Sequence, residues 1–237
     1  MSKHHIYFDL VEALKQPGCP VCRLAHSMTD SYLRALLHEM VLDVPLRDKL
    51  REALGFCQQH AWQLAAHEDG LGTAIIYRDV LNSVLRKMGS VGYEGAGALE
   101  GLRSALRPSS PRPGTRRAVE DLSPAQSCLA CVNYAEMEEV YLSSLLEHLA
   151  LDTLKDAYLA SSGLCLPHLR RALQMVKEEK TFRQLLELQR PLWEALRAEL
   201  DEFIRKHDYR FTSEGFDSER DSWLRAVAAI VGRRGAD

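Results

Sequence analysis

The sequence lacks an excess of either charge, a long apolar run and a recognisable export signal. In 237 residues, 30 Lys and Arg stand against 33 Asp and Glu, for a formal net charge of -3, so the electrostatic footprint of an ordinary nucleic-acid binder is missing. No apolar run approaches the ~18–20 residues of a membrane span. The first residues carry acids within their apolar stretch and no small-residue cleavage site. These absences predict a cytoplasmic protein with no membrane partner, and they argue against nucleic acid as a partner.

Strand patterns and the common catalytic signatures are also missing. There is no GxSxG elbow, no GxxxxGK[ST] phosphate loop, and no Glu three residues before any histidine, as a di-iron bundle requires. Apolar residues instead recur at helical spacing, as in Leu24, Met28, Tyr32, Leu36 and Met40. The 46% of hydrophobic residues can bury a core. We therefore predict an all-α fold, and nothing in the sequence indicates an enzyme.

The six cysteines are few but not scattered, and none is left over. Because the cytosol keeps thiols reduced, disulfides are not expected. A single CxxC is compatible with buried reduced cysteines, and a thioredoxin-like redox pair needs a βαβ context that is absent here. The cysteines form four motifs: Cys19-Pro-Val-Cys22, Cys57-Gln-Gln-His60, Cys128-Leu-Ala-Cys131 and Cys165-Leu-Pro-His168.

The motifs belong to an internal repeat of the form CxxC…CxxH. A shift of 109 residues superimposes the CxxC pairs, and a shift of 108 superimposes the CxxH pairs. Two copies of a four-ligand pattern arise by chance far more rarely than a single CxxC. The correspondences include Cys19 with Cys128, Cys22 with Cys131, Tyr32-Leu33 with Tyr141-Leu142, Asp43 with Asp152, Gly55 with Gly163, Cys57 with Cys165, and His60 with His168.

Three thiolates and one imidazole form a standard ligand set for structural zinc. A CxxC brings two sulfurs to one side of a turn, and a CxxH at the start of a helix offers both donors on one face, where the helix N-terminus favours the thiolate. We therefore predict two zinc ions, with iron–sulfur clusters as the alternative. The repeat favours ligation within each copy, although the CxxC of one copy and the CxxH of the other could also pair. The predicted ligands are Cys19, Cys22, Cys57, His60, Cys128, Cys131, Cys165 and His168.

The expected organisation is two pseudo-repeated helical units, each clipped by a Cys3His metal site, plus C-terminal helices. The first unit spans residues 1–88 and the second spans 128–237, with a Gly/Pro/Arg-rich linker at 89–127 that holds one helical turn near residues 99–106. The expected helices cover residues 4–16, 23–42, 45–54, 57–87 with a break at Asp69-Gly70, 129–150, a short stretch to 159, 165–188, 191–206 with Pro191 at the first turn, and 218–231.

Two basic segments have alternative interpretations. The five arginines of residues 103–117 form either a basic arm for an acidic partner or a solvated linker. In residues 203–211, Arg205, Lys206 and Arg210 form either an anion-binding patch or a helix end whose basic side chains offset the helix dipole. A helical nucleic-acid binder that uses both segments is the third and weakest functional hypothesis.

Several strings resemble an uncharacterised bacterial domain family of unknown function that carries paired CxxC and CxxH motifs. They are CPVC, YLRALLHEMVLD, GFCQQH and FIRKHDYRF with SWLRAVAAIVG. The resemblance covers most of the chain outside residues 89–127. It implies metal ligation at the eight Cys and His residues and brings no established activity.

The first functional hypothesis is a metal-binding helical protein that acts as a structural and interaction module for an unknown protein partner. A Cys3His site fills all four positions around zinc, which leaves none for a reacting water and argues against hydrolase chemistry. The alternative is an iron–sulfur protein in electron transfer or redox sensing.

Overall fold

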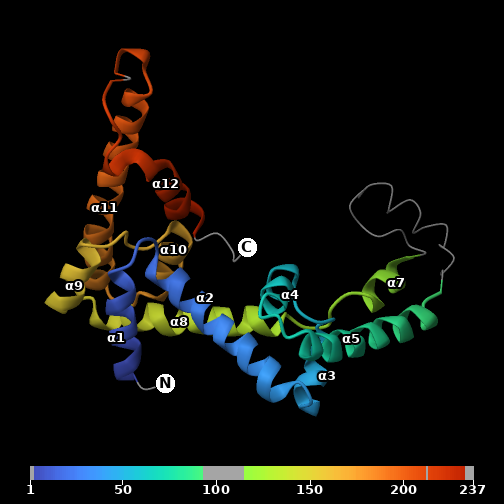
Figure 1. Ribbon diagram of the computed structural model, residues 1–237. Helices are drawn as coiled ribbons and strands as arrows, with labels where there is room; N and C mark the ends of the chain where they lie inside the picture. The colour runs from blue at the N-terminus through green and yellow to red at the C-terminus, as the bar shows by residue number, and fades with distance from the viewer. Residues whose placement is uncertain (1–2, 93–114, 212, 233–237) are drawn as a thin grey trace, which may run out of the picture. The chain divides into compact units, whose positions relative to one another are not determined.

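The computed structural model describes residues 3–92, 115–211 and 213–232, and Figure 1 shows their arrangement along the chain. Within these ranges the regular structure is helical and no strand is present, which confirms the all-α prediction. No helix in the described part of the chain is both long and apolar enough to cross a membrane. The helical turn expected near residues 99–106 lies outside the described residues.

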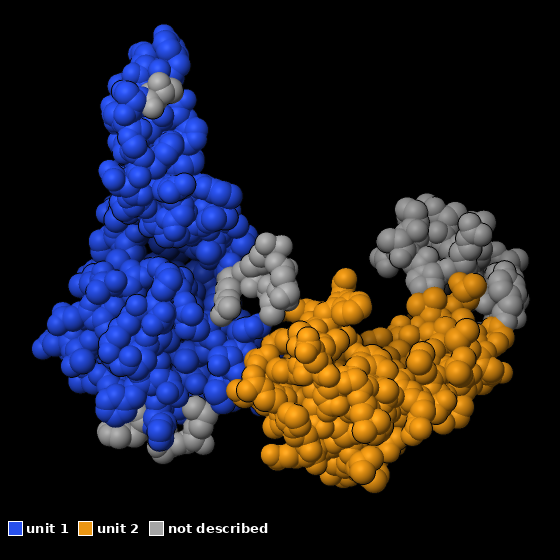
Figure 2. Space-filling view, in the orientation of Figure 1, with its two compact units in different colours: residues 1–29, 134–237 blue, residues 30–133 orange. Residues whose placement is uncertain are grey.

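The chain divides into two compact units, shown in blue and orange in Figure 2. Unit 1 comprises Met1–Thr29 and Tyr134–Asp237, and unit 2 comprises Asp30–Asn133. The boundaries lie within α2 (Pro20–Ala35) and α8 (Leu129–His148), so each unit contains parts of both sequence repeats. The predicted division into a unit at residues 1–88, a linker at 89–127 and a unit at 128–237 follows the order of the chain, and it stays a prediction.

Unit 1 is built around the apolar face of α8. Tyr141, Leu142, Leu145 and Leu149 follow one another at helical spacing and are buried. Leu10 of α1 and Leu185 of α11 pack into the same core. Besides parts of α2 and α8, the unit contains α1 (Lys3–Leu14), α9 (Asp152–Leu159), α10 (Leu166–Met175) and α11 (Glu179–Lys206).

The C-terminal part of unit 1 folds back along α11. After α11 come two short 3₁₀ turns, η3 (Tyr209–Phe211) and η4 (Ser218–Asp221), and then α12 (Ser222–Val231). α12 packs against both α11 and α10. It ends at Gly232, whose φ of 90° lies in the left-handed region that a glycine adopts without strain.

Unit 2 has a smaller core around the end of α2 and a π-helical turn, η1 (Leu36–Met40). Its other helices are α3 (Val44–Glu52), α4 (Gln58–Ala65), α5 (Gly70–Ser90) and α7 (Arg116–Asp121), and the first turn of α8 completes it. Asp43 and Asp69 cap α3 and α5, accepting hydrogen bonds of 2.8 Å from the backbone N–H groups of Leu46 and Gly72. The helical stretch is therefore interrupted before Gly70, as the sequence predicts.

The expected helix boundaries are wrong in two places. The helix predicted for residues 165–188 ends at Met175, and α11 then runs from Glu179 through Pro191 instead of starting there. Proline removes one backbone hydrogen bond, but the residues just before it, Leu185 and Leu188, are buried in the core and hold α11 continuous. In addition, α7 lies within the segment that was expected to be a linker.

Candidate metal centres

The eight predicted ligands lie at the N-termini of four helices. Cys57 and Cys165 are the N-cap residues of α4 and α10, and Cys19 and Cys128 directly precede α2 and α8. The second ligand of each motif is three residues further on, one helical turn away on the same face. In each motif the first cysteine's carbonyl accepts the opening helical hydrogen bond, from Arg23, Ala61, Val132 and Leu169, at 3.3, 2.8, 3.1 and 2.8 Å respectively.

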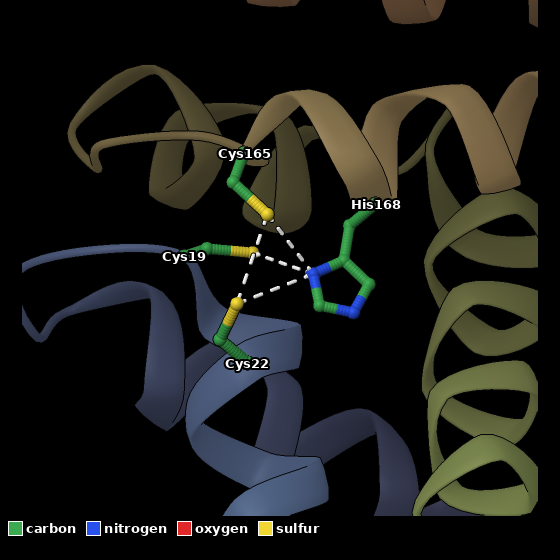
Figure 3. Close-up of side chains that lie close together, drawn as sticks. All are labelled: Cys19, Cys22, Cys165 and His168. Carbon is green, nitrogen blue, oxygen red and sulfur yellow. Dashed lines mark hydrogen bonds between the residues drawn. The ribbon is translucent and has the colours of Figure 1, made fainter. Parts of the chain in front are cut away.

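Unit 1 brings together Cys19, Cys22, Cys165 and His168, which we call site 1 (Figure 3). His168 Nδ1 lies 3.4, 3.3 and 3.1 Å from the sulfurs of Cys19, Cys22 and Cys165. The sulfurs of Cys22 and Cys165 are 3.7 Å apart. The first two ligands come from the start of α2 and the other two from the start of α10, so two helix N-termini meet at one point.

Unit 2 repeats this arrangement with Cys57, His60, Cys128 and Cys131, which we call site 2. His60 Nδ1 lies 3.2, 3.7 and 3.3 Å from the sulfurs of Cys57, Cys128 and Cys131. The sulfurs of Cys57 and Cys131 are 3.6 Å apart. The start of α4 and the start of α8 supply the two halves of this site.

The repeat favoured ligation within each copy and left pairing between copies open. The structure shows the second arrangement, because both groups of four combine the CxxC of one repeat with the CxxH of the other. The helical stretch after each CxxC explains this pairing. α2 continues into η1 up to Met40, and α8 runs to His148. A helix of this length extends about 30 Å, which carries the chain away from its own CxxC before the CxxH is reached.

The spacing of the donors fits a single tetrahedral ion. With Zn–S and Zn–N bonds of about 2.3 and 2.0–2.1 Å, a tetrahedron has edges of about 3.8 Å between two sulfurs and about 3.5 Å between sulfur and nitrogen. The sulfur–sulfur distances of 3.6 and 3.7 Å and the sulfur–nitrogen distances of 3.1–3.7 Å are close to these values. Three sulfurs and one nitrogen at these distances therefore suit a metal ion that prefers sulfur and nitrogen ligands.

Polar contacts hold the ligand loops of site 1 in place. The backbone N–H of Leu164, which precedes Cys165, donates to the Gln189 side-chain oxygen at 2.9 Å, and the Tyr158 hydroxyl donates to the same oxygen at 2.5 Å. The N–H of Gly18, before Cys19, donates to Ser162 Oγ at 3.0 Å. The two loops that carry the cysteines are thereby joined at their bases.

The corresponding loop of site 2 is tied to the end of α3. The N–H of Ala125 donates to the Glu52 carbonyl at 2.8 Å, and Gln126 Nε2 donates to the Lys49 carbonyl at 2.5 Å. These bonds place the segment before Cys128 against the helix that precedes Cys57. In both sites the loop before the CxxC is bonded to the segment before the CxxH, which is the loop after α9 in site 1 and the end of α3 in site 2.

A comparison with known protein families gives one match over the whole chain. The profile of a family of unknown function, DUF6062, matches residues 1–237. The chain belongs to DUF6062. It is also 24% identical, over 94% of this chain and 99% of the relative, to a protein described as an uncharacterized 23.9 kDa protein in the xynA 3′ region of Caldicellulosiruptor sp. (strain Rt8B.4). No solved structure matches the chain. DUF6062 membership confirms the resemblance to an uncharacterised family.

In this DUF6062 chain, Glu138 is a site residue that the sequence did not reveal. His168 faces the sulfurs with Nδ1, and its Nε2–H donates to Glu138 Oε1 at 2.6 Å. Such a carboxylate fixes the tautomer and orientation of a metal-binding histidine. Burial lowers the pKa of His168, but hydrogen bonds with Cys165, Cys22 and Glu138 outweigh it and raise the pKa to about 11.

Burial and crowding also perturb the thiols. Burial raises the pKa of Cys19 well above its ordinary value, whereas hydrogen bonds with Cys165 and Cys19 lower the pKa of Cys22. In site 2, partial burial of the thiol group, followed by a hydrogen bond with Cys57, raises the pKa of Cys131 to about 12, although the residue as a whole is exposed. Neighbouring thiols therefore resist ionising together, and a bound cation is the charge that would stabilise all of them as thiolates.

The two sites differ in their exposure. In site 1, Cys22, Cys165 and His168 are buried, whereas in site 2 only His60 is buried and Cys131 is exposed. The end of α12 covers part of site 1, since a Cβ added at Gly232 would lie 3.5 Å from the Cys22 sulfur and 3.7 Å from the Cys165 sulfur. Site 1 is thus protected by a helix that follows the second repeat.

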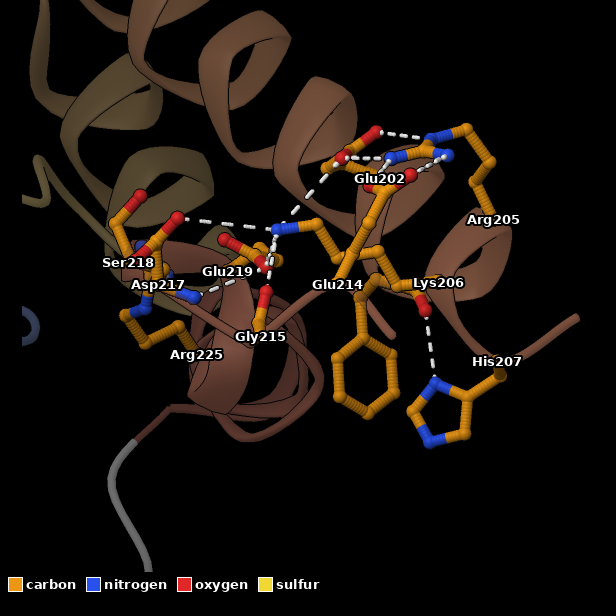
Figure 4. A network of polar contacts seen from close by, with 11 residues as sticks. Glu202, Arg205, Lys206, His207, Glu214, Gly215, Asp217, Ser218, Glu219 and Arg225 are labelled. Carbon is orange, nitrogen blue, oxygen red and sulfur yellow. Dashed lines mark hydrogen bonds and ion pairs between the residues drawn. The ribbon is translucent and has the colours of Figure 1, made fainter. Parts of the chain in front are cut away.

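Acidic residues neutralise the basic side chains of residues 203–211, and Figure 4 shows the partners of Arg205 and Lys206. Arg205 pairs with Glu202 and Glu214, and Arg210 pairs with Asp208 at 2.7 Å. The buried Lys206 donates to Glu219 at 2.7 Å and to the carbonyl of Gly215 at 2.8 Å. Because these cations already have acidic partners, the structure favours a helix end fixed by ion pairs over an anion-binding patch.

Proposed function

We propose that this DUF6062 protein is a helical zinc protein in which each compact unit holds one ion in a closed structural site. The observation that carries the proposal is the convergence of eight donors into two groups of four, each group with all its ligand atoms within 4.8 Å of one another. Three cysteines and one histidine occupy all four positions of a tetrahedral ion. This ligand set supports a structural role over hydrolytic catalysis, and the reduced cytoplasm keeps such thiolates available.

The close spacing of the four ligand atoms in each group supports zinc over an iron–sulfur cluster. Clusters with several irons distribute their protein ligands over different metal atoms, so ligands on different irons stand further apart than ligands that share one ion. Here the His60 and His168 nitrogens each lie within 3.7 Å of three sulfurs. This spacing supports a single ion at each site.

The first test is metal analysis and an absorbance spectrum of protein purified without oxygen. Two zinc ions per chain and no visible colour are the expected result. Iron with acid-labile sulfide and a brown absorbance near ~400 nm would replace this proposal with a role in electron transfer or redox sensing.

A ligand variant then assigns the ions to their sites. Cys57→Ser is expected to lower the zinc content by one ion per chain, because a site with one thiolate fewer loses affinity and its metal is coupled to folding. Cys165→Ser should remove the other ion. An unchanged metal content in either variant would contradict the assignment.

The interaction part of the proposal is supported by α12. This helix packs through small or half-buried residues such as Ser222, Ala228 and Ala229, and it exposes half or more of each bulky residue Trp223, Leu224, Val227, Ile230 and Val231. Contiguous apolar surface of this kind is typical of protein–protein contacts, so the partner would offer an apolar helix or groove.

A photo-crosslinker at Val227 should give one defined adduct in cells, and Leu224→Asp should abolish it without changing the zinc content.

A further inference from the structure

The cysteines of site 2 are more exposed than those of site 1. Cys131 is exposed and Cys57 and Cys128 are partly exposed, whereas in site 1 only Cys19 is partly exposed. We infer that site 2 is a peroxide-sensitive zinc site, in which oxidation of Cys131 and Cys57 to a disulfide releases the ion while site 1 keeps its own. This inference rests on the zinc occupancy proposed above.

The solvent exposure of each cysteine determines which sulfurs an oxidant reaches first. Cysteine oxidation follows thiolate character and solvent exposure. Thiolate character is the same in both sites, because a thiol bound to zinc is deprotonated. Exposure is not the same, since Gly232 at the end of α12 approaches the sulfurs of the buried residues Cys22 and Cys165, while Cys131 is an exposed residue. A small peroxide therefore attacks site 2 first.

The chemistry needs only hydrogen peroxide and two thiolates. The Cys131 sulfur attacks one peroxide oxygen, the O–O bond breaks, and a sulfenic acid and a hydroxide ion result. The Cys57 sulfur, 3.6 Å away, then attacks the sulfenic sulfur, forming the S–S bond and expelling the second hydroxide. Two thiolates lose two electrons, and the peroxide takes them up.

Loss of two thiolates dismantles the site. A disulfide between Cys57 and Cys131 leaves Cys128 and His60 as the remaining donors, half of the four that a structural zinc ion requires. The ion is then released. The new bond links the start of α4 to the start of α8, the same two elements that the ion joins. A thiol reductant together with zinc should restore the original site.

The test uses the full-length zinc-loaded protein. Peroxide is added in the presence of a chromogenic zinc chelator, and samples are alkylated and mapped by mass spectrometry. One ion per chain should appear at least about tenfold faster than the second, in step with a Cys57–Cys131 disulfide. Thiol reductant and zinc should reverse the change.

Two variants isolate the sites. Cys165→Ser retains site 2 and should show only the fast release, whereas Cys131→Ser retains site 1 and should show only the slow release. If either variant does not fold, peptide mapping of the wild-type protein still assigns the first disulfide.

Equal release rates, a first disulfide among the site 1 cysteines, or release without the Cys57–Cys131 disulfide would overturn the inference. Two zinc ions that both resist peroxide would overturn this inference alone. A purified protein with no zinc would overturn the proposed function with it.

Discussion

Site 1 and site 2 have the same ligands and the same local geometry, but different surroundings. Site 1 has a carboxylate behind its histidine, a buried glutamine that holds one ligand loop, and the end of α12 over its sulfurs. In site 2 the ligand loop is tied to the end of α3, and Cys131 is exposed. α11 and α12 follow the second repeat and belong to unit 1. The repeat supplies the candidate ligands of both sites, whereas the end of α12, which lies beyond the repeated motifs, covers two sulfurs of site 1.

The largest effect should come from removing a ligand of the enclosed site. Cys165→Ser is expected to destabilise unit 1 by roughly 3 kcal/mol or more, because the free energy coupled to one structural zinc ion is roughly 10–16 kcal/mol and the remaining donors are buried. Cys131→Ser, at the exposed edge of site 2, should cost less. Chemical denaturation followed by helical circular dichroism, with zinc content measured in parallel, provides the comparison. Equal losses for the two variants would show that enclosure does not affect stability.

The glycines that precede the two CxxH motifs offer a matched pair. Gly163 has a φ of 67°, and an added Cβ would lie 2.7 Å from Gln189 Oε1. Gly55 has a φ of 89°, but its Cβ would meet only the Tyr77 ring at 3.4 Å. Gly163→Ala should therefore cost about 2–3 kcal/mol from strain and overpacking, and Gly55→Ala about 1 kcal/mol from backbone strain alone.

Thermal unfolding of the two glycine variants tests this difference. Gly163→Ala should also weaken zinc binding at site 1, because Gln189 holds the backbone of Leu164 beside Cys165. The interpretation fails if Gly55→Ala proves the more damaging change.

The carboxylate behind His168 should affect affinity at one site only. Glu138→Gln is expected to weaken zinc binding at site 1 about 10–100-fold, the usual cost of losing an outer partner of a ligand histidine, and to leave site 2 unchanged. Competition with a chelator of known affinity measures both sites. Glu139→Gln is the control, because Glu139 is exposed and contacts Arg171 only at 3.9 Å. A similar loss in the control, or a loss at both sites, would contradict the role of Glu138.

The ligands were predictable from the sequence, but their pairing was not. Cys and His at fixed spacing, duplicated along the chain, identify donors regardless of the fold. The repeat is equally compatible with ligation within or between copies. A long helix after each CxxC separates its two ends by about 1.5 Å per residue, but the path of the chain beyond that helix depends on tertiary packing, which the repeat does not encode.

Other features depend on contacts that leave no local signal. Glu138 lies on α8, 30 residues before His168, and the repeat aligns it with Thr29, so duplication did not mark it. The proline at 191 indicated a helix start, but burial of neighbouring α11 residues outweighs one lost hydrogen bond. In both cases tertiary packing determines the outcome.

The smallest effect concerns the ion pair that fixes the C-terminal part of unit 1. A hydrogen bond from Lys206, together with backbone N–H groups, lowers the pKa of Glu219 to about 2, compared with about 4.3 in an unfolded chain. Because the folded-state pKa is the lower one, the pair stabilises the protein above roughly pH 5, and this contribution is lost as the pH falls toward 2. Glu219→Gln should therefore unfold at a lower temperature than the wild type at pH 7, and the gap should narrow on acidification.

Comparing the variant with the wild type at each pH separates this effect from acid loss of zinc, which both proteins share. Glu214→Gln serves as the control, because Glu214 pairs with Arg205 at the surface, where ion pairs contribute little. Peptide-level hydrogen exchange should show faster exchange in α12 for Glu219→Gln at pH 7 and unchanged exchange around site 2. A temperature gap that stays constant with pH would mean that Glu219 acts through packing instead of charge, and the enclosure of site 1 would then not depend on this ion pair.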